Sequence, residues 1–181
     1  AVTHCKKAIN IKPDLPEAHN NLGIGLQDLG KLEDAVASYG KALVIKYDYP
    51  RAHSNLGTVL GELGKPEEAI TSYRKALALH PNFADAHNNL GTTLQDLGQL
   101  EEAMVSYRKA LTIKPDLADA HNNLGSVLQE LGKPGEGLAQ HRRAISLDPQ
   151  NDLFWASFAG SLEQITFTSV DDTLYQDLLL L

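Results

Sequence analysis

A short peptide that returns at a fixed interval constrains the fold of this chain more than any other feature. It reads AHNNLG at Ala18–Gly23, Ala86–Gly91 and Ala120–Gly125, and AHSNLG at Ala52–Gly57. Successive copies begin 34 residues apart, at positions 18, 52, 86 and 120, with no insertion. Such a period is typical of one supersecondary unit stacked on copies of itself, because a single unit cannot bury its own apolar face. We therefore expect a repeat architecture.

Each repeat is predicted to contain two helices. In the first full repeat His19, Leu22, Gly23, Leu26 and Leu29 recur at three- and four-residue spacing, which places them on one helical stripe. A glycine follows this stripe in every repeat, where a residue with positive φ commonly ends a helix. These glycines are Gly30, Gly64, Gly98 and Gly132.

The second helix of each repeat has matching start and end signals. It is expected to begin at Leu32, Pro66, Leu100 or Pro134, and proline is tolerated in a first helical turn because its missing N–H has no partner there. Acidic pairs follow, and basic residues gather near the far end, so both ends complement the helix macrodipole. The pattern predicts helix, short turn and helix, repeated.

The recurring residues resemble the tetratricopeptide repeat; in the first full repeat they are Leu22, Gly23, Leu26, Gly30, Ala35, Tyr39 and Ala42. The resemblance implies an all-α, right-handed α-solenoid whose first helices line a concave groove. The small residues at Gly23, Ala35 and Ala42 would let helices approach closely, since larger side chains would hold the backbones apart.

This register divides the chain into a partial repeat at 1–15, full repeats at 16–49, 50–83, 84–117 and 118–151, and a degenerate repeat with capping helices at 152–181. Residue 1 falls inside a repeat, so we expect the chain to be an excerpt of a longer protein. In the last segment Asp171 stands where the close-packing Ala is expected, and Ser169–Asp172 reads as a helix start. A cap and a junction to a following domain both stay open, because Leu178–Leu181 ends the chain on apolar residues.

Several positions depart from the family pattern. Histidine occupies the place of a large aromatic residue, and Tyr47 replaces the closing proline of the first full repeat. Gly135 and Gly137 lie in the second helix of the fourth repeat, where each is expected to cost about 1 kcal/mol relative to Ala and to make that helix the loosest. Cys5 aligns with core tyrosines and is expected in the core. The histidines are His19, His53, His87 and His121.

Amide side chains form rows on the opposite face of the first helices. A carboxamide offers a donor and an acceptor, which matches a peptide backbone, and a ladder of such weak bonds gives useful affinity. The expected peptide-binding residues are Asn21, Asn55, Asn89 and Asn123, with Asn20, Asn88 and Asn122 beside them and Gln27, Gln95 and Gln129 lower down. The alternative is that these amides bond to neighbouring helices or stay hydrated. The repeats are similar to those of the O-GlcNAc transferase family, whose asparagine ladder holds extended polypeptides.

Charge narrows the class of partner. The formal net charge of -7 argues against nucleic acid and anionic membranes, which need clustered Lys and Arg. Acidic residues repeat at the rim of the groove and favour a neutral or cationic protein ligand; they are Asp28, Glu62, Asp96 and Glu130. A single cysteine and no apolar run long enough for a bilayer make the cytoplasm the most compatible location.

Other kinds of site are not expected. The four histidines should lie roughly 10 Å apart on neighbouring packed helices, too far apart to share one zinc ion. The row Lys7, Lys41, Lys75, Lys109 and Arg143 reads as a solvated outer face. No nucleophile, base and acid recur together, so we expect no catalytic residue and no cofactor.

The sequence therefore predicts a protein-interaction module that binds an extended peptide. One alternative is the substrate-recognition arm of a larger enzyme, such as a glycosyltransferase similar to O-GlcNAc transferase. Another is a self-assembling scaffold, since Val2, Ile9 and Ile11 lack a preceding repeat.

Overall fold

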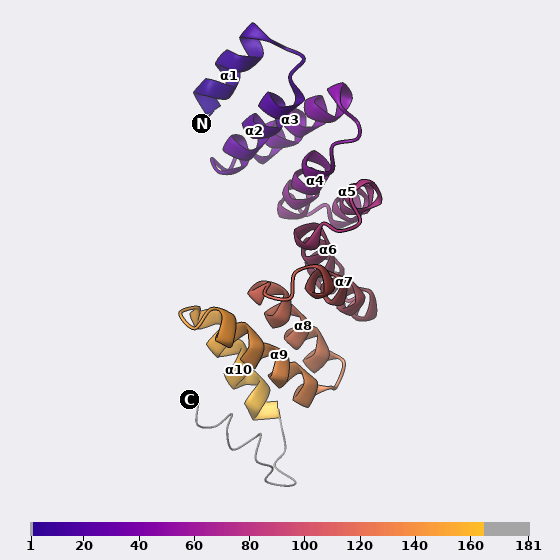
Figure 1. The fold of residues 1–181 in the computed structure, drawn as a ribbon, viewed down its shortest axis with the longest axis vertical. Helices are drawn as coiled ribbons and strands as arrows, with labels where there is room; N and C mark the ends of the chain where they lie inside the picture. Colours follow the sequence, from indigo (N-terminus) through magenta and orange to yellow (C-terminus); the bar gives the residue numbers. More distant parts are fainter. Residues whose placement is uncertain (1, 165–181) are drawn as a thin grey trace. The chain divides into compact units, whose positions relative to one another are not determined.

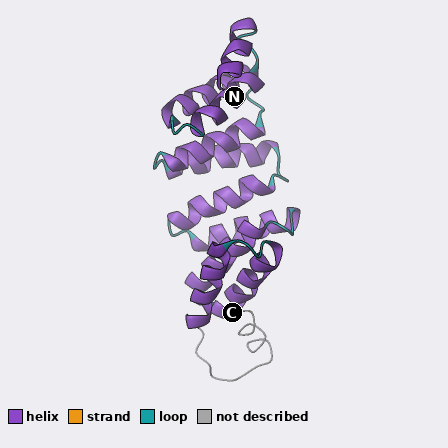
Figure 2. Cartoon of the chain, turned by 90° about the vertical axis from the view of Figure 1, so that its left-hand side faces the viewer, coloured by secondary structure: helices purple, strands orange, loops and turns teal. Residues whose placement is uncertain are grey.

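The computed structural model describes residues 2–164, and within them the chain forms α-helices and no strand. The helices are α1 (Val2–Ile11), α2 (Pro16–Gln27), α3 (Leu32–Ile45), α4 (Pro50–Glu62), α5 (Pro66–Leu79), α6 (Ala84–Asp96), α7 (Leu100–Ile113), α8 (Ala118–Glu130), α9 (Pro134–Leu147) and α10 (Asp152–Gln164). Figure 1 shows α2 with α3, α4 with α5, and α8 with α9 as antiparallel pairs, and Figure 2 shows the helices joined by short loops. The predicted all-α fold of helix-turn-helix repeats is confirmed.

The chain divides into two compact units, residues 1–98 and residues 99–181. In the first unit α2 packs on α3 and α4 packs on α5, and the first helices α2, α4 and α6 also contact one another in sequence order. In the second unit α8 packs on α7, α9 and α10, and α9 packs on α10. The predicted repeat boundaries agree with where these helices begin and end but remain predictions.

Glycine ends the first helices as predicted. Gly30, Gly64, Gly98 and Gly132 have φ between 69° and 73°, in the left-handed region that other residues rarely adopt. At the first of these turns the Lys31 N–H donates to the Leu26 carbonyl, 2.9 Å away, across the glycine. This bond satisfies one of the carbonyls that a helix end leaves unpaired. The second helix then starts at once.

An aromatic ring packs directly on a glycine in the first two full repeats. A Cβ atom on Gly23 would lie 2.6 Å from Cε1 of Tyr39, and one on Gly57 would lie 2.8 Å from Cε1 of Tyr73. Tyr39, Ala35 and Ala42 are all 0% exposed. The expectation that small residues permit close helix approach is therefore confirmed for this repeat.

The fourth repeat modifies this arrangement in two ways. His141 takes the place of the tyrosine, and a Cβ on Gly125 would lie 2.6 Å from its Cε1 atom. Gly137 takes the place of the close-packing alanine, and a Cβ there would lie 2.8 Å from the backbone oxygen of Gly125. Gly137 is therefore a contact residue between α8 and α9. Helix propensity alone predicts that Gly137 destabilises α9, but it does not predict this contact with α8.

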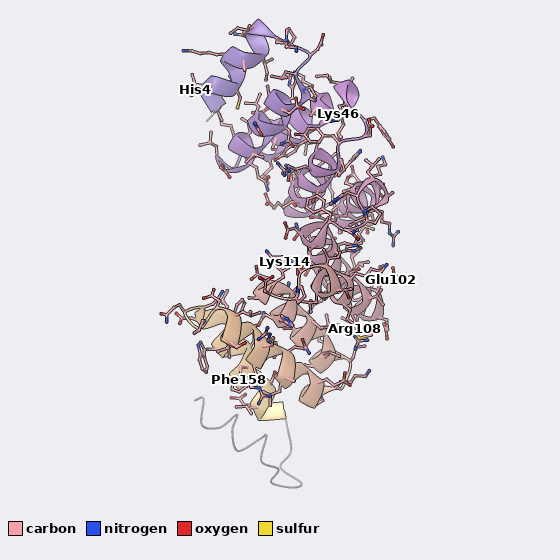
Figure 3. All side chains as sticks on the ribbon, viewed as in Figure 1. His4, Lys46, Glu102, Arg108, Lys114 and Phe158 are labelled. Atoms are coloured by element: carbon pink, nitrogen blue, oxygen red, sulfur yellow. The ribbon has the colours of Figure 1, made fainter. Side chains whose placement is uncertain are left out.

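The second unit's core extends into α10. Phe154, Phe158 and Leu162 of α10 pack with Leu138 and Ile145 of α9; Phe158, labelled in Figure 3, is 0% exposed. The expected features at Ser169–Asp172 and Leu178–Leu181 lie outside the described residues.

The outer helices carry the predicted basic row. Every member of the row is exposed, namely Lys7, Lys41, Lys75, Lys109 and Arg143. Cys5, expected in the core, is only partly buried, because no residue of α1 is fully covered. Among the described residues, no helix combines the length and the apolar character that crossing a membrane requires.

Candidate binding surface

The predicted binding residues lie on the first helix of each pair. We call them the amide surface. In the first unit it comprises Asn20, Asn21 and Gln27 on α2, Asn55 on α4, and Asn88, Asn89 and Gln95 on α6; in the second it comprises Asn122, Asn123 and Gln129 on α8. Because α2, α4 and α6 pack side by side, the amides of the first unit come from adjacent helices. Each unit is described separately below.

Asn20 does not face the groove as expected, because it is 1% exposed. Its Oδ1 accepts a hydrogen bond from Nδ2 of Asn55 at 3.1 Å, and its Nδ2 donates to Oδ1 of Asn21 at 3.5 Å. A helical wheel of α2 alone placed Asn20 on the polar side. That side is partly covered by α4 of the next repeat, which a single-helix wheel cannot include.

Asn89 makes the corresponding contact with a different partner. Ser54 replaces the first asparagine of the motif in the second repeat, so no carboxamide is available there. Nδ2 of Asn89 instead lies 3.5 Å from Oγ1 of Thr58 and donates to it. Nδ2 of Asn88 donates to Oδ1 of Asn89 at 3.4 Å. The second asparagine of the motif thus bonds to the preceding repeat in both cases.

Asn55 keeps hydrogen-bonding capacity beyond its contact with Asn20. A carboxamide has two donors and two acceptor lone pairs. Asn55 is half-buried and uses one N–H, and within residues 2–164 its Oδ1 has no hydrogen-bond partner. Asn21 is exposed, while Asn89 and Asn123 are half-buried. Asn55 can therefore still offer one N–H and one oxygen to a ligand.

The glutamine row serves the scaffold instead. Oε1 of Gln27 accepts a hydrogen bond from the hydroxyl of Tyr39 at 3.1 Å, and Nε2 of Gln27 donates to Oε1 of Glu62 at 2.7 Å. Burial, with the negative charges of Asp28 and Glu62, raises the pKa of Tyr39 far above its usual value. The phenol therefore stays protonated and remains a donor.

In the second unit His141 organises the amides of α8. Its ring is 0% exposed; Nδ1 lies 3.2 Å from Oδ1 of Asn122 and Nε2 lies 3.1 Å from Oε1 of Gln129. Burial lowers the pKa of His141 to about 4, so the ring is neutral near pH 7. A neutral imidazole has one donor and one acceptor, so one of the two carboxamides turns its NH2 toward the ring. Asn122 and Gln129 are thus held by the scaffold.

Sequence reasoning missed the hydroxyl groups that reach this surface. Tyr73 donates its O–H to Oγ1 of Thr58 at 3.1 Å, the same oxygen that Asn89 contacts. Burial is the main cause of the raised pKa of Tyr73. Two sequence signals were available: the tyrosines share the 34-residue period, and the position of Thr58 is also Thr or Ser at Thr92 and Ser126.

The histidines of the motif all make the same backbone contact. Nε2 donates to the carbonyl oxygen six residues earlier, at 2.8 Å from His19 to Pro13, 2.9 Å from His53 to Tyr47, and 3.0 Å from His87 to Pro81 and from His121 to Pro115. Nε1 of Trp155 does the same toward Pro149 at 3.0 Å. The histidines are therefore structural ring donors, and no metal-ligating cluster occurs among the described residues.

Each first helix that carries an amide row also ends in an acidic residue. Asp28, Glu62, Asp96 and Glu130 are exposed at the C-terminal ends of α2, α4, α6 and α8. A carboxylate at that end opposes the helix macrodipole and does not stabilise the helix. Helix stability therefore does not explain this row.

Comparisons with known proteins identify the repeat. A family model described as TPR repeat matches residues 26–64, 59–98 and 95–132, and one described as Tetratricopeptide repeat matches residues 118–151. The search of curated proteins gave no match. The narrower resemblance to O-GlcNAc transferase repeats stays a prediction.

Solved structures with the same fold include several repeat proteins. MamA is 26% identical over 82% of this chain and 87% of its own, with a TM-score of 0.74. Pseudomonas aeruginosa pilF is 28% identical over 82% of this chain and 68% of its own, with a TM-score of 0.77. A chain of the APC/C hetero-tetramer Cut9-Hcn1 is 17% identical over 89% of this chain and 32% of its own, with a TM-score of 0.83, and shows the fold alone.

Proposed function

Because this chain belongs to the tetratricopeptide repeat family, whose members are protein-interaction modules, we propose that it binds an extended peptide segment of a partner protein along the amide surface. The observation that carries the proposal is the Asn55 carboxamide. It gives one N–H to Asn20 and keeps an oxygen and a second N–H without a partner in residues 2–164. An extended backbone presents donors and acceptors that match these two groups.

The contacts to the preceding repeat help such binding. Oδ1 of Asn20 holds the Asn55 side chain, and Oγ1 of Thr58 holds that of Asn89. An amide that is already oriented loses less conformational entropy when a ligand binds. The asparagines are thus prepared for recognition by the same bonds that hold the repeats together.

The acidic helix ends select the charge of the ligand. Their carboxylates oppose the helix macrodipole, so an interaction outside the helix accounts for them better than helix stability does. Complementary charge favours a peptide that is cationic or neutral and disfavours an acidic one. This module binds and carries out no catalytic step of its own.

The test is a double substitution, Asn55→Ala with Asn89→Ala. Fluorescence anisotropy with labelled, unstructured peptides of equal length and positive, zero or negative charge measures affinity. The unmodified chain should bind the cationic and neutral peptides more tightly than the acidic one. Loss of two hydrogen bonds of about 0.5 to 1.5 kcal/mol each should weaken that binding by about 5- to 150-fold.

A matched control removes a hydroxyl that the amide surface does not use. Thr71 is exposed on α5 and bonds to the Glu67 backbone, so Thr71→Ala should leave affinity unchanged. Circular dichroism on each variant establishes that the helices persist. Unchanged peptide affinity in the folded double variant removes the amide surface from the mechanism.

A further inference from the structure

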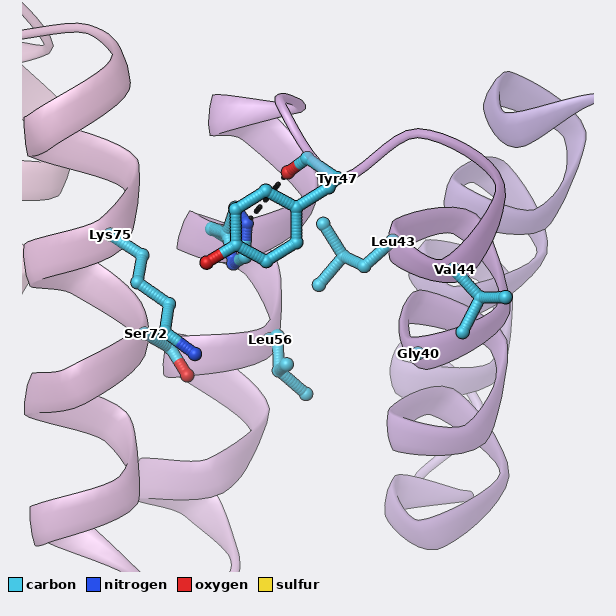
Figure 4. Close-up of a pocket in the computed structure, with 8 residues that line it drawn as sticks. Gly40, Leu43, Val44, Tyr47, Leu56, Ser72 and Lys75 are labelled. Atoms are coloured by element: carbon cyan, nitrogen blue, oxygen red, sulfur yellow. Dashed lines mark hydrogen bonds between the residues drawn. The ribbon is translucent and has the colours of Figure 1, made fainter.

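A pocket of about 410 Å³ opens in the first unit (Figure 4). Its walls come from α3 and α5, with α4 between them. None of the amide residues lines it, so the proposed peptide binding does not use it. The volume falls within the range of small-ligand sites, about 300 to 1,000 Å³.

One missing side chain accounts for the opening. Gly40 lines the pocket, and no atom lies within 4 Å of the place where its Cβ would be. The other full repeats carry arginine at this position, as Arg74, Arg108 and Arg142. The first full repeat alone among the four has glycine at this position.

At the equivalent location in the second unit, side chains connect the neighbouring helices. Arg108 of α7, labelled in Figure 3, pairs with Glu136 of α9 at 4.0 Å. Gln140, the counterpart of Ser72, lies with its Oε1 2.8 Å from Nδ1 of His121. Side chains thus cross between the second helices in this unit.

The first unit lacks both bridges. Gly40 has no side chain to reach α5, and Ser72 directs its hydroxyl to the Glu68 carbonyl of its own helix at 3.0 Å. Glu68, the counterpart of Glu136, pairs instead with Lys65 of its own repeat at 3.8 Å. The pocket is therefore a local departure from a closed arrangement that the same chain uses elsewhere.

Apolar and aromatic groups form most of the pocket wall. Val44 is 87% exposed and Tyr47 is 63% exposed, although both border a concavity. Tyr47 stands where the other repeats have proline, and its ring meets the His53 ring edge-on, with centroids 5.5 Å apart. Leu43 and Leu56 complete the apolar wall (Figure 4). Large exposed apolar residues around a concavity mark a binding site.

Lys75 supplies the charge of this pocket. It lines the wall beside Ser72 and makes no ion pair within residues 2–164. Burial is the main cause of the lowered pKa of His53, and the positive charge of Lys75 lowers that pKa further. Lys75 and His53 therefore lie close enough to interact electrostatically. An ammonium group at the edge of an apolar pocket attracts a carboxylate and repels a cation.

We propose that this pocket binds an acidic peptide segment, with one large apolar side chain between Val44, Tyr47 and Leu56 and a neighbouring carboxylate on Lys75. The side chain fills the volume that Gly40 leaves open. This charge preference is the opposite of the one expected at the amide surface. The chain thus carries two docking sites for chemically different segments.

The experiment uses the full chain and three labelled pentapeptides blocked at both ends. The sequences are Glu-Asp-Phe-Asp-Glu, the same peptide with a central Ala, and Lys-Lys-Phe-Lys-Lys. The chemical shifts of the pocket amides report binding at this pocket apart from the amide surface, and they should show the first peptide binding there at least tenfold more tightly than the other two. Amide chemical shifts should move for Val44, Tyr47 and Ser72 and stay fixed for Asn21 and Asn55.

Two substitutions locate the binding. Gly40→Met fills the pocket with an uncharged side chain and should abolish binding of the acidic peptide. Methionine favours a helix more than glycine does, so this variant should keep its fold. Lys75→Glu should reverse the order of the acidic and basic peptides. The matched control Lys109→Glu changes the equivalent lysine of the next repeat and should have no effect.

The outcomes that overturn the proposal are equally definite. Equal affinity of the pocket for the three peptides would refute the proposed ligand chemistry, and unchanged binding of the acidic peptide by Gly40→Met would refute the proposed location. Either result leaves the amide surface untouched, because the Asn55→Ala and Asn89→Ala substitutions test that surface separately.

Discussion

The carboxamide of Asn55 donates a hydrogen bond to Oδ1 of Asn20, 3.1 Å away in the first helix of the preceding repeat. The acceptor is almost fully buried, whereas the donor is half-buried. Neighbouring asparagines of one motif thus have different roles. Asn20 holds two repeats together, and Asn55 is the residue that we propose to contact a ligand.

Substitution should separate these roles. Asn20→Ala removes a buried acceptor and leaves the Asn55 N–H without it, so the free energy of unfolding should fall by about 1 to 3 kcal/mol. Asn21→Ala changes an exposed residue and should alter stability by less than about 0.5 kcal/mol. Urea unfolding followed by circular dichroism measures both. Equal losses for the two variants would contradict the assignment.

The two glycines of α9 should respond oppositely to alanine. A Cβ on Gly135 meets nothing within 4 Å, so Gly135→Ala should stabilise the protein by about 0.5 to 1 kcal/mol through helix propensity. A Cβ on Gly137 would lie 2.8 Å from the Gly125 carbonyl oxygen and 3.1 Å from Cγ of Gln129, so Gly137→Ala should destabilise. Thermal unfolding compares the pair, and a gain for both would mean that α8 and α9 separate without cost.

His141 should make stability depend on pH. Its folded pKa of about 4 lies below the ordinary value of 6.5, so below pH 6.5 the unfolded chain binds the proton more readily. Stability is therefore full above pH 6.5 and falls as pH drops toward 4, by about 3 kcal/mol in all. His141→Tyr, which introduces the residue of Tyr107, should remove this contribution.

The measurement is urea unfolding of both proteins at pH 7 and pH 4.5. Titration of the carboxylates is common to the two proteins, so the difference between their losses reports His141. If both lose the same free energy, the buried ring is not the source.

The ring position of the first helix should accept tryptophan. Nε2 of His19 donates to the Pro13 carbonyl, while its buried Nδ1 has no hydrogen-bond partner in the described chain. His19→Trp keeps a ring N–H, as Trp155 does toward Pro149, and removes the unpaired nitrogen. His19→Phe lacks the donor. The Trp variant should be more stable than the Phe variant by about 1 kcal/mol in chemical denaturation, and the reverse order would refute the role of the bond.

Local signals predicted the helices well. Positive-φ glycines at Gly30 and Gly64 end helices where expected, and prolines at Pro66 and Pro134 start them where expected, because these residues act through their own backbone. The same holds for the small residue Ala35, whose role follows from its repeat position.

Contacts between repeats were harder to predict. The face of a single helix predicts Asn20 in the groove, because it takes no account of neighbouring helices. In the structure α4 of the next repeat contacts Asn20, which is buried. Gly137 was judged by propensity alone, although its significance lies in the distance to Gly125. To predict the pocket at Gly40, one would have to know both that the arginine is missing and that Lys75 lies on the opposite wall. Such distances are known only from the three-dimensional structure.

The contact between glycine and an aromatic ring has an evolutionary consequence. Gly23 faces Tyr39, Gly57 faces Tyr73, and Gly125 faces His141 at distances that leave no room for a methyl group. A mutation at one member of a pair is tolerated only if the ring opposite becomes smaller or shifts. Across homologous sequences these two positions should consequently covary. A substitution at the glycine should be accompanied by a substitution at the ring that faces it.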